Sequence, residues 1–411
     1  MRNLRIFLIF AIVPAFALSV GCGGSSSGSS NSSSSTTTTT QTIATSGANV
    51  ASITVNAGPN GNYVNGAFAS VIVCVPGTSN CQTIDGILVD TGSSGLRILS
   101  SALTITLPQQ KASDSNPVVE CLPFVDSYTW GPVQTADVQI ASEKAASVPI
   151  QVLSDTDFTT PTACSNGFLP ADTLPALGAN GILGVGLAAQ DCGSACVQTG
   201  TTNPGLYYEC PSSSCATTGV VTGEALAQQV INPVALFTTD NNGVIVELPP
   251  VAGAEATVSG SLVFGIGTQS NNALGTATIY TAPNAAFTTT YKSQTFAEGF
   301  IDSGSNGYFF PDSTIPICSD YTGFYCPSST ENLSATNQAS GASGTVDFSV
   351  ANADALFANL SDNAFEDLGG PTGGPTPNYF DWGLPFFYGR NVYTAIEGMS
   401  TPGGTGPFWA Y

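Results

Sequence analysis

The sequence predicts an all-β protein with few, short helices that is divided into two related halves. Short apolar runs alternate with turn-forming residues along the 411 residues, which include 45 Gly and 26 Pro. No long stretch has the 3.6-residue periodicity of an amphipathic helix. One motif occurs twice, as Asp90-Thr91-Gly92-Ser93 and as Asp302-Ser303-Gly304-Ser305. The length allows two domains, so one copy of the motif can belong to each half.

Each copy places a carboxylate at the end of an apolar run. Gly86-Ile87-Leu88-Val89 precedes Asp90, and Gly299-Phe300-Ile301 precedes Asp302. Burying a carboxylate is costly unless hydrogen bonds stabilise it. The small residues of the turn let backbone amides and hydroxyls approach the carboxylate closely. A single copy would indicate an ordinary turn, but two copies predict two carboxylates that face each other.

Charge and composition exclude several classes of function. The net charge is −21, with 7 Lys and Arg against 28 Asp and Glu, so the surface would repel nucleic acid. The chain has no histidine, which excludes Ser-His-Asp and Cys-His catalysis and any histidine metal site. Carboxylates therefore remain the natural acid–base groups of an enzyme of this size.

Residues 1–21 have the pattern of a secretory signal, with Arg2 and Arg5 followed by an apolar stretch. The segment ends in Leu18-Ser19-Val20-Gly21-Cys22, which resembles the bacterial lipobox, in which the cysteine is acylated after cleavage. Ser19 departs from the leucine that is usual there. The alternative is an ordinary cleaved signal with an unrelated cysteine.

Residues 22–47 are rich in Gly, Ser and Thr and are expected to form a flexible tether. With the lipobox, this tether predicts an exported lipoprotein of the bacterial cell envelope. An acyl anchor on Cys22 would hold it to the membrane, on either the periplasmic or the cell-surface side.

Ten cysteines remain after Cys22. An even number in an exported protein predicts up to five disulfides. We expect Cys74 to pair with Cys81, and Cys318 with Cys326, because each pair would close a turn. The pairing of the other six stays open. Zinc sites are the alternative, although the spacing lacks two clear CxxC motifs.

Further segments, in the same order along the chain, resemble the pepsin-like aspartic proteases. Beyond the two Asp turns, Ile182-Leu183-Gly184 matches the hydrophobic-hydrophobic-Gly segment that runs beside a catalytic turn in that family. Gly260-Ser261-Leu262-Val263-Phe264-Gly265 resembles the strand that opens the second lobe, and the aromatic-rich segment 379–393 resembles the final one, with Trp382-Gly383 as the second-lobe counterpart of Leu183-Gly184.

The resemblance covers roughly residues 50–400 and implies a bilobal pepsin-like fold. Two β-barrel-like lobes would enclose an interlobe cleft. The N-terminal lobe would span 48–235 and carry Asp90, and the C-terminal lobe would span 236–411 and carry Asp302.

The resemblance also implies roles for the two turns. Asp90 and Asp302 would share one proton and activate a water, with no metal and no organic cofactor. The neighbouring residues would support this pair. Thr91 and Ser303 would tie the turns together. The outer carboxylate oxygens would accept hydrogen bonds from Ser93 and Ser305, while backbone amides and room for the water would come from Gly92 and Gly304.

Two features depart from the pepsin pattern. Tyr128, with Trp130 nearby, is the candidate for the aromatic residue of the hairpin that covers the cleft, but the Gly-rich hairpin signature is missing. Arg97 stands where the family commonly has tryptophan. We expect Arg97 either to pack on the ring of Tyr128 or Trp130 as a cation, or to lie in solvent.

These observations leave two main hypotheses. The first is a lipid-anchored aspartic endopeptidase that acts as a monomer on extended polypeptides in its cleft. The second is a non-catalytic lipoprotein of the same fold that binds a peptide or polymer there. The signal, tether and domain together also resemble an uncharacterised bacterial lipoprotein family. A calcium or polysaccharide binder is a third and weaker hypothesis.

Overall fold

The computed structural model describes residues 41–411 except 113, 155, 156, 166, 212, 214, 216–218 and 373–377. The predicted signal, Cys22 and most of the predicted tether fall in residues 1–40, outside the described residues. Among the residues that are described, no helix is long and apolar enough to cross a membrane.

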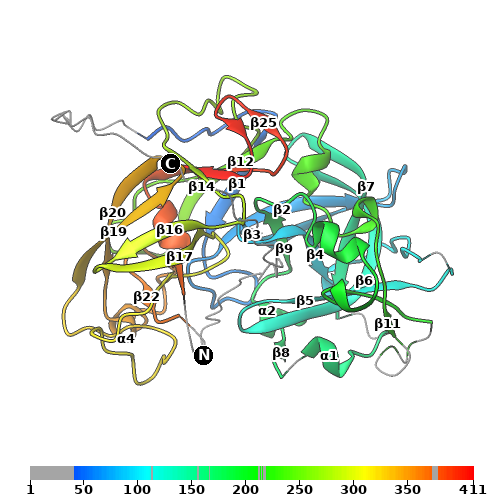
Figure 1. The fold of residues 1–411 in the computed structure, drawn as a ribbon, viewed down its shortest axis with the longest axis horizontal. Coiled ribbons are helices and arrows are strands. Elements are labelled where there is room, and N and C mark those ends of the chain that lie inside the picture. Colours follow the sequence, from blue (N-terminus) through cyan, green and yellow to red (C-terminus); the bar gives the residue numbers. More distant parts are fainter. Residues whose placement is uncertain are drawn as a thin grey trace, which may run out of the picture.

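The protein is an all-β, bilobal molecule, as the sequence predicts. In Figure 1 the blue, cyan and green strands of the first lobe lie on the right, and the yellow and orange strands of the second lie on the left. The described α-helices have four residues each: α1 (Thr162–Ser165), α2 (Leu174–Leu177) and α4 (Ala353–Leu356). Strands, and the turns at their ends, therefore position the described candidate site residues.

The larger sheet runs through both lobes. Most of its strands come from the first half of the chain: β1 (Val50–Val55), β2 (Ala67–Cys74), β3 (Cys81–Asp90), β4 (Ser94–Leu99), β5 (Val118–Pro123), β6 (Ser127–Ile140), β7 (Glu143–Leu153), β8 (Leu169–Pro170), β9 (Gly181–Val185), β10 (Tyr207–Glu209) and β11 (Val220–Val221). Five more belong to the second half: β12 (Gly243–Leu248), β14 (Val258–Phe264), β15 (Ile279–Thr281), β24 (Arg390–Ala395) and β27 (Phe408–Ala410). The strand order is β11-β10-β5-β6-β7-β4-β9-β3-β2-β1-β14-β12-β24-β27-β15, with β8 beside β6.

A second sheet, of seven strands, belongs to the second lobe. Its order is β20-β19-β16-β17-β23-β18-β22. These strands are β16 (Phe287–Tyr291), β17 (Gln294–Ile301), β18 (Tyr308–Phe309), β19 (Glu331–Ala339), β20 (Ala342–Val350), β22 (Gly369–Gly370) and β23 (Tyr379–Trp382). Two small pairs complete the fold: β13 (Ala254–Glu255) with β21 (Ala364–Phe365), and β25 (Ser400–Thr401) with β26 (Gly404–Thr405).

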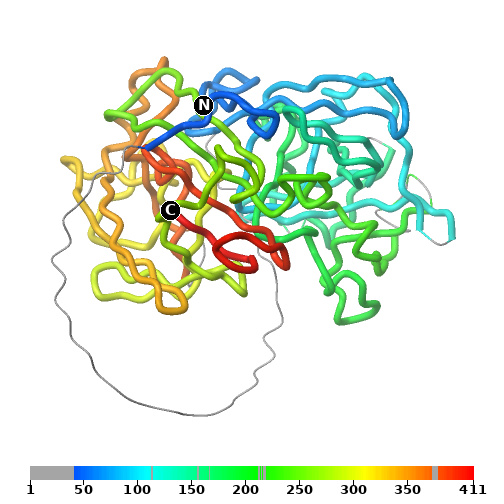
Figure 2. The backbone as a smooth tube through the Cα atoms, turned by 90° about the horizontal axis from the view of Figure 1, so that it is seen from above, coloured from blue at the N-terminus to red at the C-terminus, as the bar shows by residue number. Residues whose placement is uncertain are grey.

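The N-terminal strand joins the two lobes. β1 pairs antiparallel with β14 over its whole length and with β2 at its end. The residues just before it also lie on the second lobe, because Gln41 Nε2 donates to Leu248 O at 2.9 Å and Ala44 N donates to Glu247 at 2.6 Å. In Figure 2 this blue segment runs along the orange and red part of the chain. The lobe boundary at 235/236 stays a prediction.

Ten cysteines form five disulfides. The two predicted pairs, Cys74–Cys81 and Cys318–Cys326, are confirmed. The other six pair as Cys121–Cys164, Cys192–Cys196 and Cys210–Cys215, which corrects the zinc alternative. Such cross-linking is typical of exported proteins.

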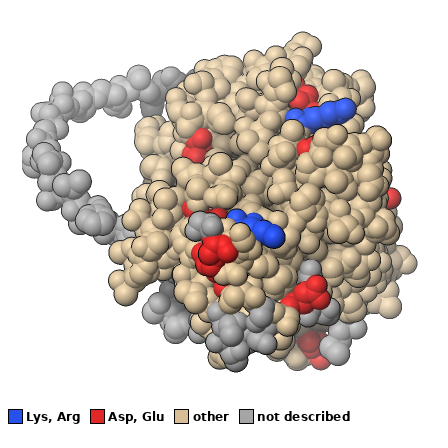
Figure 3. All heavy atoms as spheres, turned by 90° about the vertical axis from the view of Figure 1, so that its right-hand side faces the viewer, with Lys and Arg blue, Asp and Glu red and all other residues tan. Residues whose placement is uncertain are grey.

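Charged side chains are sparse on the surface. Only 9% of the residues are charged, and the face of the first lobe in Figure 3 carries a few scattered acidic and basic groups. On that face, the described charged side chains form no concentrated patch of the kind that would attract a highly charged partner.

Candidate active site

Each Asp turn lies beside a strand that is completely buried. Asp90 ends β3, which pairs in parallel with β9 so that Asp90 lies opposite Gly184. A Cβ atom on Gly184 would lie 2.7 Å from Ser93 Oγ, so only glycine fits there. In the second lobe β17 pairs in parallel with β23, and Ile301, just before Asp302, lies opposite Trp382. The two turns are therefore built in the same way.

Hydroxyl groups tie the two turns together across the lobe interface. Ser303 N donates to Thr91 Oγ1 at 2.9 Å, and Thr91 N donates to Ser303 Oγ at 3.1 Å. Ser303 Oγ in turn donates to Val89 O at 2.8 Å. Both side chains are buried, so these bonds are shielded from competing water. The structure thus brings Thr91 and Ser303 together as the resemblance implied.

Asp90 and Asp302 have no exposed surface, and each accepts hydrogen bonds from its own turn. Asp90 Oδ2 accepts from Ser93 Oγ at 2.5 Å, and its Oδ1 accepts from Gly92 N at 2.8 Å. Asp302 Oδ2 accepts from Ser305 Oγ at 2.9 Å, and its Oδ1 accepts from Gly304 N at 2.7 Å. The two carboxyl groups are held in matching frames.

The carboxyl groups also face each other closely. Gly92 N, which donates to Asp90, donates to Asp302 Oδ1 as well, at 3.0 Å. A Cβ atom on Gly92 would lie 2.5 Å from Asp302 Cγ, and one on Gly304 would lie 2.7 Å from Asp90 Cγ. The glycines are required because the opposite carboxyl group fills the space of a side chain.

The pair holds protons more tightly than isolated carboxyl groups. Burial raises the pKa of Asp90, although hydrogen bonds from Asp302, Ser93 and the Gly92 amide act in the opposite direction. Burial, followed by the charges of Asp90 and Asp381, raises the pKa of Asp302 well above its usual range. Two such groups titrate as a unit. Burial and the hydrogen bond between the two groups let the pair keep one proton more readily than isolated carboxyl groups do.

A groove lined by both lobes adjoins the turns. A cavity of about 120 Å³ is bordered by Thr91, Gly92 and Ser93 on one side and by Phe300 and Trp409 on the other. A neighbouring cavity of about 510 Å³ shares with it Leu187, Ala188, Asp191 and Ala285. We call these two cavities the interlobe groove. A third hollow, of about 570 Å³, lies over β19 and β20 of the second lobe and does not include the Asp turns.

The chain belongs to the family described as "Protein of unknown function (DUF3443)". The model of that family matches residues 45–411. A comparison with curated proteins found no match. Among solved structures, an aspartic proteinase from Irpex lacteus is similar with a TM-score of 0.48 and 18% identity, over 88% of this chain and 96% of that one. This similarity is too distant to indicate activity.

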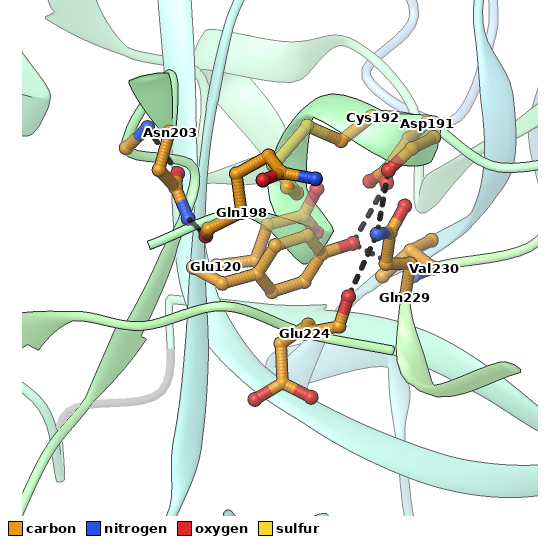
Figure 4. Close-up of a disulfide and its surroundings, with 12 residues drawn as sticks. Glu120, Asp191, Cys192, Gln198, Asn203, Glu224, Gln229 and Val230 are labelled. Carbon is orange, nitrogen blue, oxygen red and sulfur yellow. Dashed lines mark hydrogen bonds between the residues drawn. A yellow bond between two sulfur atoms is a disulfide. The ribbon is translucent and has the colours of Figure 1, made fainter. Parts of the chain in front are cut away.

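Arg97 differs from both expectations. It is fully buried, and its guanidinium pairs with Asp191 at 2.8 Å and Glu120 at 3.1 Å. Asp191 also accepts a hydrogen bond from Tyr207 Oη at 2.7 Å, in the region beside the Cys192–Cys196 disulfide (Figure 4). An arginine cannot lose its charge in a protein, so burial requires such partners. The network links the hairpin strand β5 to the wall of the interlobe groove.

Tyr128 and Trp130 lie in a buried cluster. They pack with the cysteines of two disulfides, Cys121–Cys164 and Cys210–Cys215, and Trp130 Nε1 donates to Phe158 O at 3.0 Å. Leu122 and Pro123 of the same hairpin, rather than these aromatics, line the interlobe groove. A role of Tyr128 and Trp130 in covering the cleft stays a prediction.

Two buried polar residues beside the second turn, Asp381 and Asn306, were not singled out in the sequence analysis. Asp381 is the third residue of β23 and has no exposed surface. Asn306 follows Ser305, and neither atom of its side-chain amide has a hydrogen-bond partner. The signal for Asp381 was present, because a carboxylate within Tyr379-Phe380-Asp381-Trp382 is out of place in a buried strand.

One group of possible metal ligands occurs among the described residues. The ligand atoms of Cys318, Cys326 and Asp354 lie within 4.8 Å of one another. The two sulfurs are joined in a disulfide, so they are not available as thiolate ligands. The arrangement at the turns, in contrast, can perform acid–base chemistry with carboxyl groups alone.

Proposed function

We propose that this protein is an aspartic-type endopeptidase that hydrolyses polypeptides with a water activated between Asp90 and Asp302. The observation that carries the proposal is the single Gly92 amide that donates to both carboxyl groups, since it requires them to face each other closely. Their buried position and raised pKa values support a pair that shares one proton.

The proposed reaction uses one ionised and one protonated carboxyl group. Ionised Asp90 accepts a proton from water while the water oxygen attacks the peptide carbonyl carbon. Asp302 gives its proton to the carbonyl oxygen, and a tetrahedral diol forms. A proton from Asp90 then reaches the leaving nitrogen, the carbon–nitrogen bond breaks, and Asp302 regains its proton from the diol. No other reactant is consumed.

The interlobe groove is the proposed substrate site. Its wall near the turns carries apolar side chains such as Leu187, Phe300 and Trp409, and the walls come from both lobes. Gly92 and Ser93 line the groove but Asp90 and Asp302 do not, so cleavage requires that a bound extended chain gains access to the buried carboxyl pair. The proposed lobes are 48–235 and 236–411.

We further propose that the enzyme acts outside the cytoplasm as a lipid-anchored monomer. The five disulfides support folding in an oxidising compartment. The anchor would be an acyl group on Cys22, after removal of residues 1–21.

A binding protein of the same fold is the second candidate. It is favoured by the placement of Tyr128 and Trp130, which pack against disulfides instead of lining the groove. Such a protein would hold a peptide or polymer between its lobes without cleaving it.

Cleavage of an unstructured peptide library between about pH 3 and pH 7 tests the proposal. The full-length chain, with its disulfides formed, is compared with Asp90→Asn and Asp302→Asn. We expect each substitution to abolish cleavage, because each keeps the shape and breaks the proton sharing. Asp85→Asn is the matched control, since Asp85 lies on the same strand as Asp90 but is exposed.

Cleavage that persists in either Asn variant would show that other groups do the chemistry. No cleavage by the folded wild-type chain would favour the binding protein. Peptides retained by the wild-type chain in the same library would then identify what the groove holds.

A further inference from the structure

Asp381 occupies a position that is apolar in the other lobe. In β9 the residue two places before Gly184 is Ile182, which lies opposite Leu88. In β23 the residue two places before Gly383 is Asp381, which lies opposite Phe300. Ile182 is part of an apolar cluster of the first lobe, so the second lobe has replaced a core residue by a carboxyl group.

The carboxyl group lies beside the second Asp turn. β23 runs between β17 and β18, so Asp381 has the backbone of the Asp302 strand on one side and Phe309 on the other. Backbone hydrogen bonds fix the turn to the same strand, because Asp302 N donates to Trp382 O at 3.1 Å and Leu384 N donates to Ser305 O at 2.7 Å. Asp381 therefore belongs to the frame that holds Asp302.

Within the part of the chain that the structure describes, no lysine or arginine forms an ion pair with Asp381. Neither of its oxygens has a hydrogen-bond partner of normal geometry, and the side chain has no exposed surface. The polar groups that interact with it are the Ser305 hydroxyl and the carboxyl groups of Asp90 and Asp302. An ionised carboxylate in this place would face two further carboxyl groups and a single hydroxyl, which is very costly.

The proton count at Ser305 decides the state of Asp381. A serine hydroxyl has one hydrogen to donate. Ser305 Oγ already donates it to Asp302 Oδ2 at 2.9 Å. A bond between Asp381 and Ser305 therefore needs the hydrogen of Asp381, which donates to a lone pair of Ser305 Oγ.

We propose that Asp381 is a positioning residue, a third and protonated carboxyl group that donates to Ser305 and thereby holds the Ser305 hydroxyl on Asp302. Asp90, Asp302 and Asp381 then carry two protons in the working enzyme. One is shared by the pair, and the other stays on Asp381. The first lobe has no equivalent, because Ile182 cannot form such a bond.

Infrared spectroscopy of the full-length chain at neutral pH tests the protonated state. The difference spectrum between wild type and Asp381→Asn should show the loss of a carboxylic acid C=O band. Loss of carboxylate bands in that difference would mean that Asp381 is ionised and would overturn the proposal. Asp302→Asn provides the reference intensity for one buried acid of the same site.

A second measurement needs no variant. In wild-type protein labelled with ¹³C at the aspartate carboxyl carbon, the resonance of Asp381 should keep the shift of an acid from about pH 5 to pH 8. A titration to the carboxylate shift at the acid end of this range would contradict the proposal, even if Asp381→Asn failed to fold.

The positioning role rests on the proposed peptidase activity and is tested through it. Asp381→Leu removes the donor to Ser305 and should lower kcat about five- to tenfold with little change in KM. Asp381→Asn restores a donor, and should recover most of that loss. Asp367→Asn is the matched control, because Asp367 is also a partly unpartnered acid of the second lobe but lies outside the turn.

Equal losses in Asp381→Leu and Asp381→Asn would show that Asp381 serves packing alone, and would overturn the positioning role. If the wild-type chain cleaves no peptide, the proposed peptidase fails. The infrared and ¹³C results still decide whether a third protonated carboxyl group is present.

Discussion

The two Asp turns share a backbone and differ in the charge that lies behind them. Both carboxyl groups accept hydrogen bonds from a serine hydroxyl and a glycine amide of their own turn. Behind the first turn lies buried Arg97, whose charge lowers the pKa of Asp90. Behind the second lies Asp381, a further buried carboxyl group in place of a cation. The same turn shape thus lies in two different electrostatic environments, and the proposed assignment of an ionised Asp90 and a protonated Asp302 can be tested through them.

Removing the buried cation is the strongest way to break this comparison. Arg97→Leu leaves the buried carboxyl groups of Glu120 and Asp191 without their cation, and should lower the free energy of unfolding by about 3–5 kcal/mol. Urea unfolding of both proteins at pH 7 measures the difference. Lys292→Ala is the control in the second lobe. Its ion pair with Asp312 is half exposed on the lysine side, so the loss should be about 0–1 kcal/mol.

Similar losses from both substitutions would mean that the Arg97 network contributes no more than a surface pair. Adding Asp191→Asn to Arg97→Leu should recover part of the lost stability, because it removes one unpartnered charge.

Because the two turns share a backbone shape, we expect that neither tolerates a side chain at its glycine, Gly92 or Gly304. In Gly92→Ala or Gly304→Ala the added Cβ atom would meet the opposite carboxyl group at 2.5 or 2.7 Å. We expect about a hundredfold or greater loss of kcat/KM from either change, since displacing a reacting group by about 1 Å has that effect. Gly61→Ala is a poor match because Gly61 has a positive φ. Gly323→Ala is the better control, because no atom lies within 4 Å of its added Cβ. Full activity in either turn variant would contradict the close facing of the carboxyl groups.

The part of the site that could be predicted from the sequence is the part encoded locally. Asp-Thr-Gly-Ser and Asp-Ser-Gly-Ser specify their own hydrogen bonds within three residues, so the two carboxylates and their supporting hydroxyls were visible. The all-β class followed from short apolar runs and many turn residues, and the bilobal arrangement followed from the resemblance to the pepsin-like aspartic proteases.

The electrostatic environment could not be predicted in the same way. The partners of Arg97 lie 23 and 94 positions away, at Glu120 and Asp191, and no local pattern connects them. Asp381 was visible as a carboxylate in an apolar strand, but its neighbour Ser305 is far away in sequence and close only in the fold. Long-range pairs of this kind set the charges that surround the two carboxyl groups.

Glu224, a buried acid of the first lobe, tests whether a nearby charged group, rather than the lobe in which a carboxyl group lies, determines its pKa. Glu224 is 3% exposed, and burial, with a smaller effect of the Glu209 charge, raises its pKa from 4.5 to about 7. The raised value means that its contribution to stability is complete below about pH 4.5 and is lost as the pH rises through about 7. Glu224→Gln has no titrating carboxyl group at this position, so its stability should not decline in this pH range. After allowance for solvent screening, the variant should exceed wild type by about 1–2 kcal/mol at pH 8 and match it at pH 4.

Unfolding by urea at a series of pH values checks the window. Glu209→Gln should move the wild-type decline to lower pH, because Glu209 helps to raise the pKa of Glu224. A constant difference between Glu224→Gln and wild type at every pH would show that the carboxyl group does not titrate there.

The smallest expected effects come from the two hydroxyls, and they sharpen the comparison most directly. Ser93 lowers the pKa of Asp90, so Ser93→Ala should move the acid limb of the kcat/KM profile to higher pH. Ser305 donates to Asp302, and without that donor Asp302 should keep its proton longer, which moves the upper limb to higher pH. Each change should cost about fivefold in kcat/KM at the optimum.

The assignment of limbs is the critical result. The hydroxyls of Ser93 and Ser305 are equivalent in the two turns. If the fold alone decided which carboxyl group holds the proton, Ser93→Ala and Ser305→Ala would therefore shift the same limb of the kcat/KM profile by the same amount. If Arg97 and Asp381 decide it, Ser93→Ala affects the ionisation of Asp90 and Ser305→Ala affects the protonated state of Asp302. Asp381→Asn in the Ser305→Ala background should then add little, since the hydroxyl through which Asp381 acts is already absent.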